Sequence, residues 1–148
     1  MQMTPDKKKN KLYIVVPCYN EEQVLGETSK RLKIKCENLI QKGQISKDSK
    51  IVFVDDGSKD RTWKMISELH ETDSLFSGVK LSRNRGHQNA LLAGLTMASE
   101  HADMAISMDA DLQDDINAVD QMIEKYYEGC DIVYGVRSAR ETDTFFKR

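Results

Sequence analysis

Met104-Ala-Ile-Ser-Met-Asp-Ala-Asp-Leu-Gln113 is the stretch of this sequence that decides its fold. Its first half is short and largely apolar, as a buried strand of a parallel sheet is. The polar residues after it would leave the sheet at the carboxyl ends of the strands, where open α/β sheets bind ligands. Asp109 and Asp111 stand there one residue apart, and such oxygens suit a divalent cation that keeps water and phosphate as its other ligands. Capping a helix or forming a turn is the alternative role for both aspartates.

The rest of the chain repeats this order of apolar strand, polar loop and amphipathic helix. We expect strands at residues 12–16, 51–54, 79–81, 104–108 and 131–134. Pro17 should end the first strand because it has no N–H to donate, and Asn20 with Gln23 resembles a pair that caps the next helix. Strands separated by helices require crossovers and are therefore mostly parallel. The pattern predicts an α/β fold: a doubly wound, Rossmann-like, mostly parallel sheet with helices on both faces.

Composition narrows the class of protein. The chain has 148 residues, 31% charged and 39% hydrophobic, with a formal net charge of −2. This balance predicts one globular domain and no nucleic-acid partner. No run approaches the roughly 18 apolar residues of a membrane span and no signal core is evident, so a cytoplasmic location is expected. The lysines within residues 1–11 are interpreted as a disordered lead-in, with contact to an anionic membrane as the alternative.

The polar loops should gather at one edge of the sheet. Residues 17–22, 55–60, 83–88, 109–113 and 137–140 each follow an expected strand. Parallel strands end at the same edge, so acids and arginines meet there. That mixture suits a metal-bridged diphosphate better than a lone cation or a lone anion.

Four of these loops resemble the motifs of a known family. They are Pro17-Cys-Tyr-Asn-Glu-Glu22, Val54-Asp-Asp-Gly-Ser58, Ser82-Arg-Asn-x-Gly-His-Gln88 and Asp109-Ala-Asp-Leu-Gln113. Together they resemble the inverting family 2 glycosyltransferases with the GT-A fold. More narrowly, they are similar to the branch that charges a polyprenyl phosphate, namely dolichol-phosphate mannosyltransferase and the bactoprenol glucosyltransferases. The motifs come in family order and cover residues 12–140.

The resemblance implies roles for individual residues. The nucleotide-sugar would be bound by Pro17, Tyr19, Glu21, Val54, Asp55, Asp56, Arg83, Ala110 and Gln113. Asp109 and Asp111 would be the aspartates of the DXD motif and hold Mg²⁺ or Mn²⁺ against the donor diphosphate. Arg137 would meet the diphosphate or the acceptor phosphate, so the catalytic set is Asp109, Asp111 and Arg137. No general base is assigned, because a phosphate monoester acceptor is already anionic.

The resemblance also implies a reaction. We expect transfer of a sugar from a nucleoside-diphosphate donor, UDP-glucose in preference to GDP-mannose, to undecaprenyl or dolichyl phosphate. A polysaccharide or glycolipid acceptor in cell-envelope biogenesis is the alternative. The full-length protein would work at the cytoplasmic face of the membrane, and a homo-oligomer is a possible assembly. Residues 12–140 would form the GT-A domain, and residues 141–148 would begin a C-terminal segment.

The sequence departs from the family pattern at one loop, and it lacks the motifs of two other α/β protein classes. Relatives commonly place prolines after the Asp-Leu-Gln-Asp run, whereas this chain has Asp115-Ile-Asn117. A response-regulator-like domain would need a phosphorylatable Asp after its third strand and a Lys after its fifth, and neither is present here. A dinucleotide-dependent dehydrogenase would need Gly-x-Gly-x-x-Gly after its first strand, which is also missing.

Overall fold

The computed structural model describes residues 10–112 and 116–131. The chain divides into two compact units, Met1–Asp114 and Asp115–Arg148. Among the described residues, the first unit carries the sheet and three helices, and the second carries one helix.

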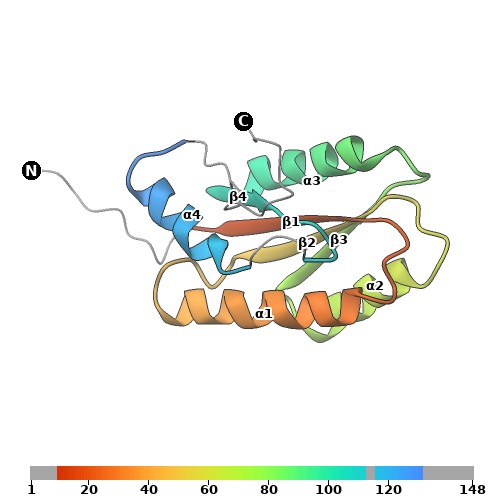
Figure 1. The fold of residues 1–148 in the computed structure, drawn as a ribbon, viewed down its shortest axis with the longest axis horizontal. Coiled ribbons are helices and arrows are strands. Elements are labelled where there is room, and N and C mark those ends of the chain that lie inside the picture. The colour runs from red at the N-terminus through yellow and green to blue at the C-terminus, as the bar shows by residue number, and fades with distance from the viewer. Residues whose placement is uncertain (1–9, 113–115, 132–148) are drawn as a thin grey trace, which may run out of the picture. The chain divides into compact units, whose positions relative to one another are not determined.

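Four parallel strands form the sheet of the first unit, in the order β3-β2-β1-β4. Their bounds are β1 Leu12–Cys18, β2 Lys50–Asp55, β3 Phe76–Lys80 and β4 Met104–Ser107. The connecting helices are α1 Leu25–Gln41, α2 Thr62–Thr72 and α3 His87–His101. Helices α1 and α2 cover one face of the sheet and α3 covers the other (Figure 1). The expected doubly wound, parallel α/β fold is confirmed.

Small residues let helix α3 lie close to its face of the sheet. Its buried positions are Ala90, Gly94 and Ala98, which recur every four residues and so share one side of the helix. They pack with the β1 and β2 side chains that point to this face, Tyr13, Val15, Val52 and Val54. A β-carbon on Gly94 would overlap Val15 and come within 2.9 Å of the Val54 side chain.

The opposite face carries the larger side chains. Successive strand residues point to opposite faces, so Ile14 and Phe53 lie on the side of α1 and α2. The ring of Phe53 stacks on that of Phe76 with their centroids 6.0 Å apart. Helix α1 buries Leu25, Leu32, Cys36 and Leu39. Each large apolar side chain removed from water in this layer contributes about 1.5–3 kcal/mol.

The prediction that Pro17 ends the first strand is wrong. Strand β1 continues through Cys18, and Pro17 is aligned with Val54 of β2. The carbonyl of Val15 accepts the Met108 amide on the β4 side. Backbone groups of a strand alternate between its two edges, so the nitrogen of Pro17 faces that same side, beyond the last paired residue of β4. No ladder bond is lost there, and the proline is tolerated.

Three other local predictions need correction. Strand β3 begins at Phe76, earlier than the expected residue 79. Strand β4 is not buried on both faces, because Ala105 and Ser107 are exposed and, among the described residues, only β1 pairs with it. Helix α1 begins at Leu25 without a side-chain cap, and the Asn20 side chain accepts the Lys59 amide instead. After the end of α1, Gly43 has a φ of 72° and its amide donates to the Ile40 carbonyl.

The second unit contains helix α4, Ala118–Tyr127, in which Val119 and Ile123 are buried. The fifth predicted strand, at residues 131–134, lies outside the described residues apart from Asp131. Within the described ranges, no helix has the length and apolar character needed to cross a membrane.

Candidate active site

A cleft of about 320 Å³ lies at the carboxyl ends of the strands in the first unit. The chain runs from β1 outward to β3 and then returns to place β4 on the other side of β1. This reversal of strand order is where open α/β sheets form a ligand crevice. The cleft is lined by Pro17, Cys18, Tyr19, Glu21, Asp56, Asn84, Gly86, His87, Ala90, Asp109, Ala110 and Asp111.

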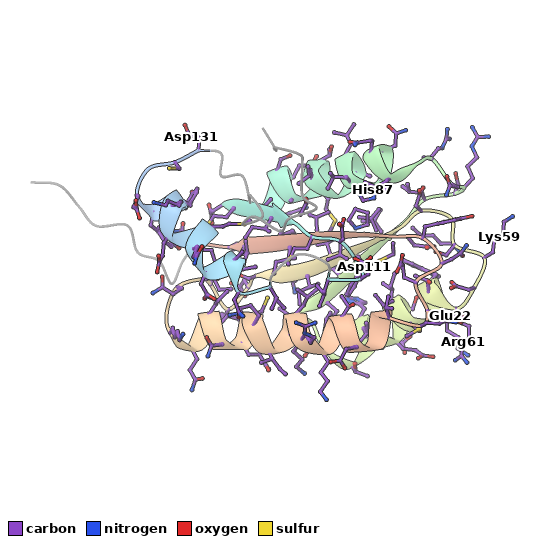
Figure 2. All side chains as sticks on the ribbon, viewed as in Figure 1. Glu22, Lys59, Arg61, His87, Asp111 and Asp131 are labelled. Atoms are coloured by element: carbon purple, nitrogen blue, oxygen red, sulfur yellow. The ribbon has the colours of Figure 1, made fainter. Side chains whose placement is uncertain are left out.

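Hydrogen bonds join the loop after β1 to the loop after β2. The Asn20 amide donates to the Ser58 hydroxyl at 2.9 Å, and the Asn20 side chain accepts the Lys59 amide at 2.8 Å. The Glu21 amide donates to Thr62 Oγ1 at 2.9 Å. Figure 2 shows Glu22 of the first loop and Lys59 and Arg61 of the second at the same end of the sheet. The loop that carries Tyr19 and Glu21 into the cleft is therefore held by the start of α2.

Asp56 holds the loop after β3. Its Oδ1 accepts the Arg85 amide at 2.7 Å and its Oδ2 accepts the Gly86 amide at 3.1 Å. Asp56 is 3% exposed, so its carboxylate is shielded from bulk water where it accepts these hydrogen bonds. Gly86 has a φ of 93° and immediately precedes the first residue of α3, His87. Asp56 thereby sets where α3 begins at the cleft.

Asp55, its neighbour, is fully buried and does not line the cleft. Its Oδ1 accepts the Ser58 amide at 3.2 Å. Its Oδ2 is buried without a hydrogen-bond partner among the described residues. Asp55 therefore stabilises the turn after β2 from its buried side.

A tight turn presents the two aspartates that follow β4. The Met108 amide donates to the Val15 carbonyl at 3.0 Å, and the Leu112 amide closes the turn on the Asp109 carbonyl at 3.1 Å. Leu112 has a φ of 52°, in the left-handed region. The Thr28 hydroxyl of α1 donates to the Ala110 carbonyl. We call residues 109–112 the acidic turn. Figure 2 labels Asp111 in this turn and His87 at the start of α3.

Negative charge accumulates in the cleft. Burial raises the pKa of Glu21, and the charges of Asp111, Asp60 and Asp109 raise it further. Burial also raises the pKa of the Cys18 thiol, with smaller contributions from the charges of Glu21 and Asp55. Cys18 therefore stays protonated and is no nucleophile.

The acidic turn has the chemistry of a divalent cation site. Carboxylate oxygens are the hard ligands that Mg²⁺ and Mn²⁺ take, and the excess negative charge around Glu21 favours a cation. In the parts of the chain that the structure describes, no three His, Cys, Asp or Glu side chains are arranged to hold a metal ion. Two carboxylates with water and substrate phosphate are nevertheless a usual set for Mg²⁺. The residues present fit a cation completed by its substrate.

The structure brings together most of the residues that the sequence selected. Seven of the twelve line the cleft: Pro17, Tyr19, Glu21, Asp56, Asp109, Ala110 and Asp111. Val54 is buried beneath α3, Asp55 is buried below the loop, and Arg83 is exposed outside the cleft lining. Gln113 and Arg137 lie outside the described residues.

Five residues of the cleft were given no role in the expected site: Cys18, Asn84, Gly86, His87 and Ala90. Asn84, Gly86 and His87 belong to the third motif, so their position after a strand was a usable signal. Ala90 gives no such signal, because a small residue in a helix looks the same whether it faces a core or a cleft.

Comparisons with known proteins agree with this geometry. The family model described as Glycosyl transferase family 2 matches residues 13–148. An uncharacterized glycosyltransferase of Bacillus subtilis (strain 168), YkoT, is 56% identical over 137 residues, covering 93% of this chain and 41% of the relative. An undecaprenyl-phosphate 4-deoxy-4-formamido-L-arabinose transferase of Enterobacter sp. (strain 638) is 36% identical, covering 99% of this chain and 42% of the relative.

A prophage bactoprenol glucosyl transferase homolog of Escherichia coli (strain K12) is 39% identical over 138 residues, covering 93% of this chain and 42% of the relative. The chain thus spans about two fifths of the length of the curated relatives it matches.

Solved structures give the same fold. A mannosyltransferase from Pyrobaculum calidifontis, PcManGT, in complex with GDP-Man and Mn²⁺, aligns with a TM-score of 0.53 at 25% identity, over 70% of this chain and 28% of that one. Residues 1–349 of S. aureus TarS with UDP-GlcNAc align with a TM-score of 0.57 at 20% identity, over 79% of this chain and 32% of that one. Both are GT-A glycosyltransferases. With its GT-A fold and a family model that covers nearly its whole length, this chain belongs to glycosyl transferase family 2.

Proposed function

We propose that this chain binds a nucleoside-diphosphate sugar in the cleft and serves transfer of the sugar to a polyprenyl phosphate. The observation that carries the proposal is the meeting of three loops at one cleft: the acidic turn, the loop with Tyr19 and Glu21, and the Asp56 loop. The activities named for the undecaprenyl-phosphate and bactoprenol relatives support the acceptor class.

Different cleft residues are proposed to bind different parts of such a donor. Tyr19, 42% exposed, offers an aromatic face and a hydroxyl to the nucleoside. Asp109 and Asp111 would hold Mg²⁺ or Mn²⁺ against the diphosphate, and the bound cation would stabilise the charge that develops on the leaving group. Arg137 is proposed to add positive charge to the same diphosphate or to the acceptor phosphate. The acceptor phosphate attacks as an anion, so the site requires no general base.

The proposed place of reaction follows from the acceptor. A polyprenyl phosphate is confined to a bilayer, and nucleotide sugars are water-soluble, so the cleft would work at the cytoplasmic face of a membrane. The acidic charge of the cleft also explains why the donor diphosphate would need a cation to approach Glu21 and Asp111. UDP-glucose is the proposed donor, and GDP-mannose is the alternative.

Calorimetric titration with UDP and with GDP, each in Mn²⁺ and in EDTA, tests the donor site. One nucleotide should bind in Mn²⁺ and bind at least tenfold more weakly in EDTA. Binding of neither nucleotide, or of both equally with and without metal, would contradict the donor assignment. Transfer from the preferred donor to undecaprenyl phosphate in detergent, compared with transfer to a polysaccharide, then decides the acceptor.

A further inference from the structure

The Thr28 hydroxyl of helix α1 bonds outside its own helix, whereas several other helical hydroxyls bond within theirs. Ser29, Ser67 and Thr96 each donate to a carbonyl of their own helix, three or four residues earlier. Thr28 Oγ1 instead donates to the Ala110 carbonyl, 82 residues away in the sequence. Its side chain is out of water, with Thr28 3% exposed and Ala110 5% exposed. The bond therefore crosses from α1 to the middle of the acidic turn.

This bond orients the peptide between the two aspartates. The Ala110 carbonyl belongs to the peptide group that joins Ala110 to Asp111. Holding that carbonyl toward α1 sets the rotation of the peptide plane and hence the direction from which the Asp111 side chain leaves the backbone. The neighbouring Leu112 amide closes the turn on the Asp109 carbonyl, so both ends of the turn are hydrogen-bonded.

The first turn of helix α1 is also tied to Glu21, another acidic residue of the cleft. The Glu21 carbonyl accepts the Val24 and Leu25 amides at 3.1 and 3.0 Å, which ties Glu21 to the first turn of the helix. Thr28 lies in the next turn of the same helix. One rigid element therefore connects the loop that carries Glu21 to the acidic turn.

We propose that Thr28 is a positioning residue for the cation site: its hydroxyl holds the Ala110 carbonyl so that Asp109 and Asp111 face the cleft in a metal-binding arrangement. This inference rests on the proposed function for its metal, but the ordering of the acidic turn by Thr28 stands on the geometry alone. Neither the motif containing Asp109 and Asp111 nor the loop after β1 includes Thr28.

The test compares Thr28→Val with Thr28→Ser. Valine keeps the shape of threonine and removes the hydrogen bond, whereas serine keeps the hydroxyl and removes a methyl group. Thr96→Val is the matched control, because Thr96 is an exposed helical threonine whose hydroxyl stays within α3. Each variant is measured for amide hydrogen exchange at Leu112 and for Mn²⁺ binding by the paramagnetic resonance signal of free Mn²⁺.

Thr28→Val should speed exchange of the Leu112 amide at least tenfold and weaken Mn²⁺ binding about tenfold, while Thr28→Ser and Thr96→Val stay close to wild type. Unchanged Leu112 exchange in a folded Thr28→Val protein would overturn the positioning role. So would Mn²⁺ affinity equal to that of wild type. If wild type binds no Mn²⁺, the metal part of the proposed function fails. Faster Leu112 exchange in Thr28→Val would then still show that the Thr28 hydrogen bond stabilises the acidic turn. Should Thr28→Val fail to fold, loss of Mn²⁺ affinity in Thr28→Ser would contradict the proposal, because serine retains the hydroxyl.

Discussion

Gly57 lies directly against the backbone of Asn84, so that a β-carbon on Gly57 would overlap the Asn84 nitrogen. The same β-carbon would come within 2.6 Å of the Arg83 carbonyl carbon. Two cleft loops that follow neighbouring strands therefore touch through their backbones, and only glycine allows that approach.

Gly57→Ala should be strongly destabilising because it combines this overlap with a φ of 71°. We expect a loss of more than about 2 kcal/mol in the free energy of unfolding. Gly86→Ala has a φ of 93° but open space, so it should cost only the backbone strain of about 1–3 kcal/mol. Gly26→Ala, in α1 with nothing nearby, should stabilise by about 0.5–1 kcal/mol. Urea denaturation of the three variants checks the order, and equal losses for Gly57→Ala and Gly86→Ala would contradict the close contact.

Asp56→Asn should loosen the loop after β3. An amide side chain has one acceptor oxygen, so one of the two bonds from the Arg85 and Gly86 amides to the buried Asp56 side chain is lost, and only the Gly86 amide has another acceptor, Asn84 Oδ1 at 3.2 Å. We expect a loss of about 1–3 kcal/mol in unfolding free energy together with weaker nucleotide binding. Asp48→Asn removes the same charge at an exposed site and serves as the control. If both variants unfold at the same urea concentration as wild type, the Asp56 carboxylate does not hold the loop.

Asp111→Ala should abolish metal-dependent nucleotide binding and leave the fold intact. Asp111 is exposed at the surface of the cleft, so its removal costs little packing. Calorimetry in Mn²⁺ and in EDTA should give equal, weak binding for the variant, with unfolding by circular dichroism unchanged. Asp48→Ala is again the control, and full Mn²⁺-dependent binding by Asp111→Ala would refute the assignment of this ligand.

Glu21 should make the metal-free protein less stable as the pH rises. Its pKa in the folded state is raised above the ordinary value of 4.5, first by burial and then by Asp111, Asp60 and Asp109. Between the unfolded and folded pKa values the folded protein binds more protons, so stability falls as pH rises through that window. The melting temperature of Glu21→Gln relative to wild type should therefore increase from pH 4 to pH 7. A difference that is constant or decreases with pH would show that the pKa of Glu21 is not raised in the folded state.

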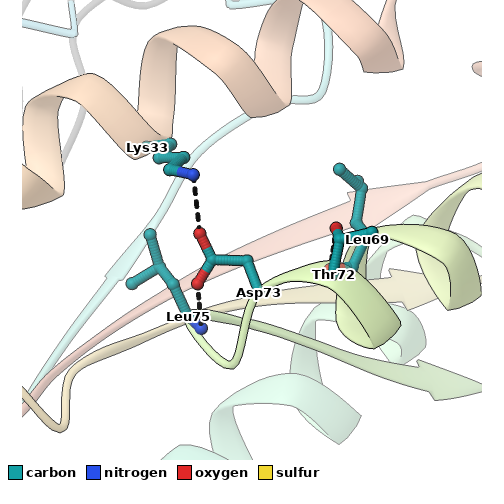
Figure 3. A network of polar contacts seen from close by, with 5 residues as sticks. All are labelled: Lys33, Leu69, Thr72, Asp73 and Leu75. Atoms are coloured by element: carbon teal, nitrogen blue, oxygen red, sulfur yellow. Dashed lines mark hydrogen bonds and ion pairs between the residues drawn. The ribbon is translucent and has the colours of Figure 1, made fainter.

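Asp73 joins α1 to the end of α2 and should contribute stability that acid removes. Its Oδ2 lies 2.8 Å from Lys33 Nζ and its Oδ1 accepts the Leu75 amide at 2.9 Å (Figure 3). The hydrogen bonds from Lys33 and Leu75 lower the pKa of Asp73 below 3.8, although burial opposes them. The stabilisation is therefore complete above the unfolded pKa and is lost as pH falls through the folded value.

Lys33→Met should cost less than about 1 kcal/mol, since the ion pair is solvent-exposed and is screened by salt. Asp73→Asn should cost more than Lys33→Met and should remove this acid-dependent part of the stability. Unfolding in urea at pH 7 and pH 3, with Lys30→Met as an exposed control, measures both effects. The assignment fails if Asp73→Asn retains the full acid dependence of wild type.

The alternation of strand and helix was predictable because each element carries its own periodic signal. The apolar runs in β1 and β2 and the helical spacing of Leu25, Leu32 and Cys36 mark elements without reference to distant residues. Parallel pairing then followed from chain connectivity. Seven predicted site residues line the cleft for the same reason, because loops after parallel strands must end at one edge.

The strand order and the partners of the buried polar groups depend on contacts between distant segments, which no local sequence pattern contains. The strand order placed β4 beside β1, which left room for Pro17 inside a strand and exposed Ala105. Asp56 and Thr28 look like ordinary loop and helix residues in the sequence. Their roles depend on partners 29 and 82 residues away, the Arg85 amide and the Ala110 carbonyl. Sequence alone thus determined the elements and the family, whereas the tertiary structure decided which buried polar groups satisfy one another, because that requires segments to be brought together in space.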